Sequence, residues 1–202
     1  MTTTVFIILA YLLGSVSFAV LASWIFRLPD PRTFGSMNPG ATNVLRSGNK
    51  AAAIFTLLGD SGKGWVAVVL AQHFAPVWGL DNKVIAVVAL LVFLGHIWPV
   101  FLRFKGGRGV ATALGVVLGL NLWPGILAVI TWIIVAIIWR FSSLSALVAA
   151  TLTPVYAWIF LGSDLSTFVI FTISLLVIWR HKSNIANLLA GKEKRIGKRG
   201  ES

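Results

Sequence analysis

The stretch "VFIILAYLLGSVSFAVLASWIF", residues 5–26, contains no charged residue and is long enough to cross a lipid bilayer. A helix of about 20 apolar residues spans the hydrocarbon core of a membrane. No cation precedes this stretch and no small-residue cleavage site follows it, so we expect a retained membrane helix rather than a removed signal peptide. Arg27 and Arg32 follow it directly, which predicts that the N-terminus lies outside and this first loop inside.

The rest of the chain has the same character. The 202 residues are 57% hydrophobic, and the mean hydropathy is +0.89. This composition, with long uncharged runs, predicts an all-α integral membrane protein. The chain contains no cysteine, which excludes disulfides, thiol nucleophiles and thiolate metal sites.

Seven apolar segments are predicted to cross the membrane. They are residues 5–26, 51–75, 84–102, 110–122, 123–139, 144–161 and 165–179. The fourth is short, because 13 residues of helix cover only about 20 Å. The alternative is one long helix over residues 110–139, kinked at Pro124.

The distribution of charge favours seven crossings. All but two of the 17 lysines and arginines then fall on the inner side; the exceptions are Lys63, within a helix, and Lys83, outside. Six crossings would place the cationic C-terminal tail outside, against the positive-inside bias. We therefore predict seven transmembrane helices with the N-terminus outside and the C-terminus cytoplasmic. The net charge of +11 is explained by this topology, so no nucleic-acid partner is expected.

One membrane domain and a tail are predicted. Residues 1–190 would form a single seven-helix domain. Residues 191–202, "GKEKRIGKRGES", would form a basic cytoplasmic tail that is disordered and attracts anionic lipid.

Three polar segments share the inner side in this topology. They are "FGSMNPGATNVLR" at 34–46, "GHIWPVFLRFKGGRGVAT" at 95–112 and "RHKSNIANLL" at 180–189. The first has the glycine spacing of a phosphate loop, but Ala41 stands where the lysine is required and no strand precedes it, which argues against nucleotide hydrolysis. Its glycines, neutral donors and Arg46 still favour an anion. The alternative is a helix-capping turn with an arginine at the inner leaflet.

The second segment contains a cationic, glycine-rich turn. Lys105 to Gly109 read "KGGRG", and Val110 opens the next helix. A helix N-terminus behind such a turn favours anion binding. Lys105 and Arg108 could instead be ordinary snorkelling residues, but snorkelling does not require three glycines. His96, which precedes Pro99, is expected at most to orient this segment.

Two further sets of residues are singled out. Asp60 and Lys63 are three apart within an apolar helix, and we expect a structural ion pair, with direct substrate contact as the weaker alternative. His181 and Asn184 are also three apart, after the last crossing, where a catalytic and a structural role remain open. No His, Asp or Glu residues show metal-ligand spacing such as H-E-x-x-H, so no metal or other cofactor is expected.

Taken in order, these segments resemble the motifs of the bacterial acyl-phosphate:glycerol-3-phosphate acyltransferases, the PlsY type. The matching stretches are "GSMNPGATNVLR", "GHIWPVFLRFKGGRGVAT" and "RHKSNIANLLAGKE", supported by "DSGKG" at 60–64. The resemblance extends from the N-terminus to about Glu193. It departs at Met37, where the family usually has glycine, and at Arg108, where it usually has lysine.

The resemblance implies a multi-pass enzyme of the bacterial inner (plasma) membrane with its active site facing the cytoplasm. Such an enzyme transfers a fatty acyl group from a long-chain acyl phosphate to the 1-hydroxyl of sn-glycerol 3-phosphate. The products are lysophosphatidic acid and inorganic phosphate, in the first step of phospholipid biosynthesis. The donor is neither acyl-CoA nor acyl carrier protein. Membrane lipid and the peripheral enzyme that makes acyl phosphate are the expected partners.

The residues agree with an activated donor. The H-x-x-x-x-D pattern of other glycerolipid acyltransferases is absent, since Trp78, Phe101 and Ala186 occupy the fifth position after each histidine. An acyl phosphate is already a mixed anhydride, so the protein mainly has to position two substrates. An anion transporter would instead predict inverted repeats, and a CDP-alcohol phosphotransferase would need clustered aspartates.

The expected site is drawn from all three segments. The expected catalytic residues are Ser36, Arg46, His181 and Asn184. The expected substrate-binding residues are Asn38, Thr42, Asn43, Lys105, Gly106, Gly107, Arg108, Thr112 and Ser143. His181 could act as a general base or as a hydrogen-bond donor to a substrate, and the absence of a nearby acid to orient the ring favours the donor role.

Overall fold

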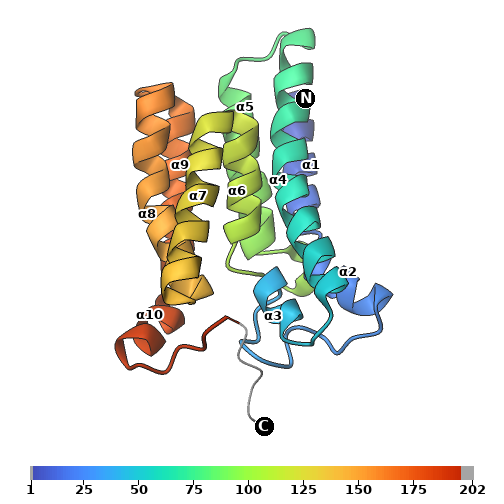
Figure 1. The fold of residues 1–202 in the computed structure, drawn as a ribbon. Helices are drawn as coiled ribbons and strands as arrows, with labels where there is room; N and C mark the ends of the chain where they lie inside the picture. Colours follow the sequence, from blue (N-terminus) through green and yellow to red (C-terminus); the bar gives the residue numbers. More distant parts are fainter. Residues whose placement is uncertain (1, 197–202) are drawn as a thin grey trace. The chain divides into compact units, whose positions relative to one another are not determined.

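The computed structural model describes residues 2–196. Every regular element in this range is a helix (Figure 1). The chain divides into two compact units, Met1–Leu120 and Asn121–Ser202. Each unit is described by itself.

The first unit contains six α-helices and one 3-10 helix. They are α1 (Thr2–Ser15), α2 (Phe18–Ile25), α3 (Ala41–Leu45), α4 (Lys50–Val77), α5 (Lys83–Ile97), η1 (Val100–Leu102) and α6 (Val110–Leu120). Helix α4 packs along α6, and α1 packs along α5. Small residues permit this close packing: a Cβ atom on Gly115 of α6 would collide with the carbonyl oxygen of Ser61 on α4.

The first predicted crossing is two helices rather than one. Helices α1 and α2 meet at an angle of 45°. Ser17 caps α2 by accepting a hydrogen bond from the Val20 N–H at 3.4 Å, which ends the α1 hydrogen-bond pattern. The Val16 carbonyl freed at the break accepts a hydrogen bond from Lys63 Nζ at 2.6 Å. The buried ammonium group of Lys63 on α4 therefore supplies the hydrogen bond that the Val16 carbonyl lacks within the helix.

The second unit contains α7 (Leu122–Trp139), α8 (Ser142–Leu161), α9 (Leu165–Arg180) and α10 (Lys182–Leu189). Helix α8 packs against both α7 and α9 (Figure 1). Helix α10 is bent by 55° from α9. The alternative of one long helix over residues 110–139 is wrong, because Asn121 caps α7 by accepting from the Trp123 N–H at 3.0 Å.

All seven predicted apolar segments are helical, but they differ in length. Among the described residues, four helices are long and apolar enough to cross a membrane: α4, α5 continued through η1, α7 and α8. The bent pairs α1–α2 and α9–α10 raise this to six if each pair is one span. Helix α6 is a shorter apolar helix. The seventh crossing and the orientation of the termini therefore remain predictions.

The first residues of the predicted tail make specific contacts. The Ile196 N–H donates to the Arg140 carbonyl at 2.7 Å, and Glu193 binds two side chains described below. The predicted disorder is therefore wrong for residues 191–196, because hydrogen bonds fix this segment to the rest of the second unit. The remainder of the predicted tail, residues 197–202, lies outside the described residues.

Candidate active site

The first polar segment is folded around the side chain of Asn43. This residue lies on α3 and is buried. Its Oδ1 accepts from the Ser36 N–H at 2.9 Å, while its Nδ2 donates to the carbonyls of Pro31 at 2.7 Å and Phe34 at 3.2 Å. These bonds commit the amide to the loop itself. Asn43 therefore holds the loop that carries Ser36, and the expected contact between Asn43 and a substrate stays a prediction.

Met37 occupies the position at which the resembled family usually has glycine. Its φ angle is 52°, in the left-handed region that costs a non-glycine residue about 1–2 kcal/mol. The side chain is exposed, so it does not collide with the rest of the loop. This departure therefore adds backbone strain, while the exposed side chain lies outside the packed part of the loop.

The two arginines of this loop differ in their partners. Arg32 is held by Asp30 through Nη2 to Oδ2 at 2.6 Å and Nε to Oδ1 at 3.0 Å. This hydrogen-bonded guanidinium holds the pKa of the Asp30 carboxyl below its usual value. Arg46, at the end of α3, is exposed, and no acidic side chain within residues 2–196 pairs with it. Arg46 is therefore the loop cation that remains available for a phosphate.

The second polar segment is a tight turn pressed against the end of α5. Arg103 and Phe104 both have positive φ angles, 51° and 62°. The Gly107 N–H donates to the His96 carbonyl at 3.3 Å. A Cβ atom on Gly106 or Gly107 would collide with His96. These two glycines are thus required for packing against His96, and their expected approach to a substrate stays a prediction.

The polar side chains of this turn differ in exposure. Lys105 is exposed and Arg108 is half-buried. Thr112, in the first turn of α6, is fully buried, and its Oγ1 has no hydrogen-bond partner within the described chain. Figure 1 shows this turn and α3 at the same end of the first unit. The anion-binding groups expected from the first two segments therefore share one end of that unit.

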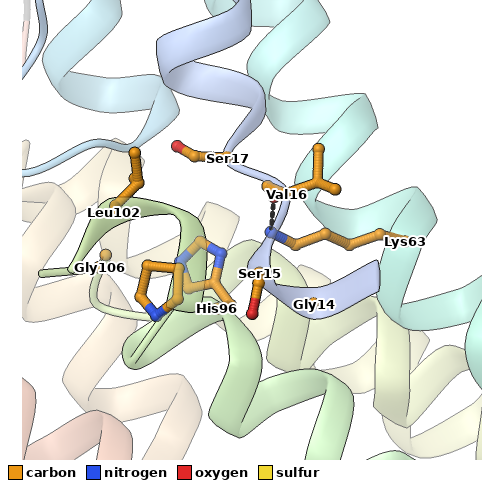
Figure 2. Close-up of a pocket in the computed structure, with 10 residues that line it drawn as sticks. Gly14, Ser15, Val16, Ser17, Lys63, His96, Leu102 and Gly106 are labelled. Carbon is orange, nitrogen blue, oxygen red and sulfur yellow. Dashed lines mark hydrogen bonds between the residues drawn. The ribbon is translucent and has the colours of Figure 1, made fainter. Parts of the chain in front are cut away.

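A set of buried polar side chains, Asp60, Lys63 and His96, lies close to the turn. Lys63 Nζ is 2.9 Å from Asp60 Oδ1 and 2.6 Å from the Val16 carbonyl. The His96 Nδ1 atom is 3.6 Å from the same Asp60 oxygen. Figure 2 shows Lys63, His96 and Gly106 around one small pocket with the α1–α2 break. This set connects the break, α4, α5 and the glycine-rich turn.

In the second unit, His181 lies at the bend between α9 and α10 and is buried. Its Nδ1 is 2.7 Å from the Val177 carbonyl. A carbonyl only accepts hydrogen bonds, so Nδ1 carries the proton and, in a neutral ring, Nε2 is an acceptor. The donor role expected from the sequence would therefore need a protonated ring, whereas a neutral ring accepts.

Ser143 and Asn184 meet at one carboxylate that the sequence interpretation missed. Glu193 Oε1 accepts from Ser143 Oγ at 2.6 Å and from Asn184 Nδ2 at 2.8 Å. The only sequence signal for Glu193 is its place at the end of the resembling stretch "RHKSNIANLLAGKE".

The expected site residues therefore fall into two groups. The first unit holds Ser36, Asn38, Thr42, Asn43, Arg46, Asp60, Lys63, Lys105, Gly106, Gly107, Arg108 and Thr112, and the second holds Ser143, His181 and Asn184. No three His, Asp or Glu side chains of residues 2–196 gather as ligands for a metal ion.

The sequence model of the glycerol-3-phosphate acyltransferase family matches residues 4–191. The glycerol-3-phosphate acyltransferase of Nitrosospira multiformis is 65% identical over 100% of both chains. That of Nitrosomonas eutropha is 63% identical over 98% of this chain and 99% of its own.

Two solved structures are also similar. Both are crystal structures of PlsY, an integral membrane glycerol 3-phosphate acyltransferase. Its glycerol 3-phosphate form is 34% identical, with a TM-score of 0.90 over 98% of this chain and 96% of that one. Its lysophosphatidic acid form is 32% identical, with a TM-score of 0.88 over the same shares. With its apolar helices and these relatives, the chain belongs to the glycerol-3-phosphate acyltransferase family and is a multi-pass membrane acyltransferase of the PlsY type.

Proposed function

We propose that this enzyme transfers a long-chain acyl group from acyl phosphate to the 1-hydroxyl of sn-glycerol 3-phosphate. The hydroxyl oxygen forms an ester bond to the acyl carbon, and the bond from that carbon to the phosphate oxygen breaks. The hydroxyl proton leaves with inorganic phosphate. The products are lysophosphatidic acid and phosphate, in the first step of phospholipid synthesis.

The observation that carries this proposal is the pair of exposed cations, Arg46 and Lys105, at one end of the first unit. Neither has an acidic partner among residues 2–196. Both reacting molecules bear a phosphate, and the glycerol 3-phosphate form of the similar crystal structure supports the acceptor. Acyl phosphate as the donor is supported by the absence of cysteine and of H-x-x-x-x-D, because a mixed anhydride needs no further activation.

Transfer with purified enzyme tests the proposal. Palmitoyl phosphate and glycerol 3-phosphate should yield equal amounts of lysophosphatidic acid and inorganic phosphate. Omitting glycerol 3-phosphate should abolish both products. Palmitoyl-CoA and palmitoyl carrier protein serve as the donor controls. Lysophosphatidic acid formed from either control donor, and not from palmitoyl phosphate, would refute the proposed donor.

Arg46→Lys is expected to be far from conservative. Lysine keeps the charge but cannot make two parallel hydrogen bonds to one phosphate. We expect kcat/KM to fall by about 5- to 150-fold, the equivalent of about 1–3 kcal/mol for a charge-assisted bond. Arg32→Lys is the matched control, because Arg32 is already bound to Asp30. If the Arg46→Lys and Arg32→Lys variants have the same kcat/KM, Arg46 does not bind a phosphate through two hydrogen bonds. Its role would then be that of a positive charge at the inner leaflet.

The proposed setting is the bacterial inner membrane, with seven crossings, the N-terminus outside and the active site cytoplasmic. The enzyme that makes acyl phosphate would then meet this protein from the cytoplasm. Single cysteines in this cysteine-free chain test the orientation. Asn82→Cys should react with an impermeant thiol reagent in spheroplasts, whereas Lys50→Cys and Lys194→Cys should react only after lysis. Equal labelling of all three before lysis would contradict the topology.

A further inference from the structure

The peptide groups that follow α5 are hydrogen-bonded to two side chains of α1. Tyr11 Oη donates to the Trp98 carbonyl at 2.6 Å, and Ser15 Oγ accepts from the Val100 N–H at 3.3 Å. Tyr11 and Ser15 are four residues apart, so they lie on the same face of α1. They are also joined to each other, because Ser15 Oγ donates to the Tyr11 carbonyl at 2.9 Å. Helix α1 thus holds the segment that leaves α5, although the partners are 87 and 85 positions apart in the sequence.

Helix α1 is itself fixed against α5. A Cβ atom on Gly95 of α5 would collide with the Tyr11 carbonyl oxygen, and a Cβ atom on Gly14 of α1 would collide with the Val92 carbonyl oxygen. Small residues allow two helix backbones to approach this closely, and a close-packed interface leaves them little room to slide. Tyr11 therefore presents its hydroxyl group from a fixed position.

Backbone hydrogen bonds continue from this attachment to Lys105. The Leu102 and Phe104 N–H groups both donate to the Pro99 carbonyl, at 3.1 and 2.9 Å, and the Lys105 N–H donates to the Leu102 carbonyl at 3.1 Å. Pro99 directly follows Trp98, the residue whose carbonyl is bound to α1. The place of the Lys105 backbone therefore depends on where α1 holds this peptide group.

The other side of the turn is attached to α5. The Gly107 N–H donates to the His96 carbonyl at 3.3 Å, and Ser15 lines the same small pocket as His96 and Gly106 (Figure 2). Lys105 lies in the sequence between these two attachments, and its side chain is exposed. The turn thus presents one cation from a backbone that is held on both sides.

We propose that Tyr11 is a positioning residue that sets the place of the Lys105 ammonium group for a substrate phosphate. This inference rests on the proposed function, in which Lys105 meets a phosphate. Electrostatic stabilisation depends on a charge that is in place before the reaction, and a displacement of about 1 Å can lower a rate by about 100-fold. Tyr11 acts through the backbone of the turn and needs no contact of its own with a substrate.

Tyr11→Phe tests the proposal, because it keeps the ring and removes only the donor to Trp98. We expect kcat/KM to fall by about tenfold, part of the loss that a displacement of about 1 Å causes. Tyr156→Phe is the matched control, since it also removes one hydroxyl group, which is hydrogen-bonded to Thr131 at 2.9 Å. This control should keep the wild-type kcat/KM, and the two variants should unfold at similar temperatures in detergent. A Tyr11→Phe enzyme with the wild-type kcat/KM would overturn the proposal.

A double-mutant cycle shows whether Tyr11 acts through Lys105. In the Lys105→Met background the positioned ammonium group is gone, so Tyr11→Phe should cause no further loss of kcat/KM. The same loss in both backgrounds would show that Tyr11 acts on another group, and would overturn the proposal.

Spin labels measure the position of the turn without turnover. The chain contains no cysteine, so labels on Lys105→Cys and Lys83→Cys report a distance along α5, a helix of 15 residues. Tyr11→Phe should shift or broaden this distance distribution. The distribution between labels on Lys83→Cys and Lys50→Cys, at the start of α4, should stay unchanged.

Two results with the labels would overturn the proposal. Equal broadening of both pairs would assign Tyr11 to helix packing alone, and no change in either pair would show that the turn does not depend on Tyr11. The label distances decide the question where Lys105→Met has no measurable turnover. Inactive wild-type protein would instead refute the proposed function itself, and the distances would then test only the attachment of the turn.

Discussion

Lys63→Met should lower the free energy of unfolding by about 3–5 kcal/mol, the usual cost of leaving a buried charge without its partner. The side chains of Lys63 and Asp60 are 1% and 2% exposed and lie 2.9 Å apart. The variant also removes the donor to the Val16 carbonyl at the α1–α2 break. Two buried acceptors would thus lose their cation at once, and both belong to the scaffold beneath the glycine-rich turn.

Thermal unfolding in detergent micelles measures this effect. Lys50→Met, on the exposed first turn of the same helix, is the matched control and should change the stability by no more than about 0.5 kcal/mol. The double variant Asp60→Asn/Lys63→Met should recover much of the loss, because no net charge then remains buried in the pair. A Lys63→Met protein as stable as Lys50→Met would show that the ion pair does not hold these helices.

His181→Ala should lower kcat by about 100-fold, within the range expected for loss of a hydrogen bond to the reacting hydroxyl and at the lower limit for loss of a general base. The sequence favoured His181 as the donor of this hydrogen bond, whereas the structure favours His181 as its acceptor. Because the Nδ1 hydrogen is donated to Val177, the hydrogen bond expected between a neutral ring and the hydroxyl is one that Nε2 would accept. The phosphate of the donor would then take the proton as the carbon–oxygen bond to phosphate breaks.

His181→Gln and His181→Asn distinguish this role from general-base catalysis. Their amide oxygens can accept a hydrogen bond but cannot take a proton at neutral pH. We expect at least one of them to retain about tenfold more kcat than His181→Ala, since an accepted hydrogen bond of this kind is worth about 1–3 kcal/mol. His73→Gln, on α4, is the control histidine variant. Equally deep losses in the Ala, Asn and Gln variants, with both substrates saturating, would make His181 the base.

Much of the architecture could be predicted from apolar run length alone. All seven predicted segments are helical, because a mainly apolar run in a bilayer satisfies its backbone hydrogen bonds by forming a helix. The family could also be predicted, because "GSMNPGATNVLR" and the two later polar segments are long and irregular. The hydrogen bond that satisfies the freed Val16 carbonyl at the break between α1 and α2 could not be predicted, since its donor, Lys63, is 47 positions away.

The sequence by itself therefore determined the membrane class, the helical segments, the family and the residue types able to meet a phosphate. These are local properties, carried by hydrophobicity and by short runs of glycine, amide and cation. Only the tertiary structure decided what each polar side chain does. It committed Asn43 to the loop backbone, tied the His181 proton to Val177, and brought Glu193 to Ser143, 50 positions away. The physical reason is that the role of a hydrogen-bonding side chain depends on which groups it contacts. Groups far apart in the sequence meet only after the chain has folded.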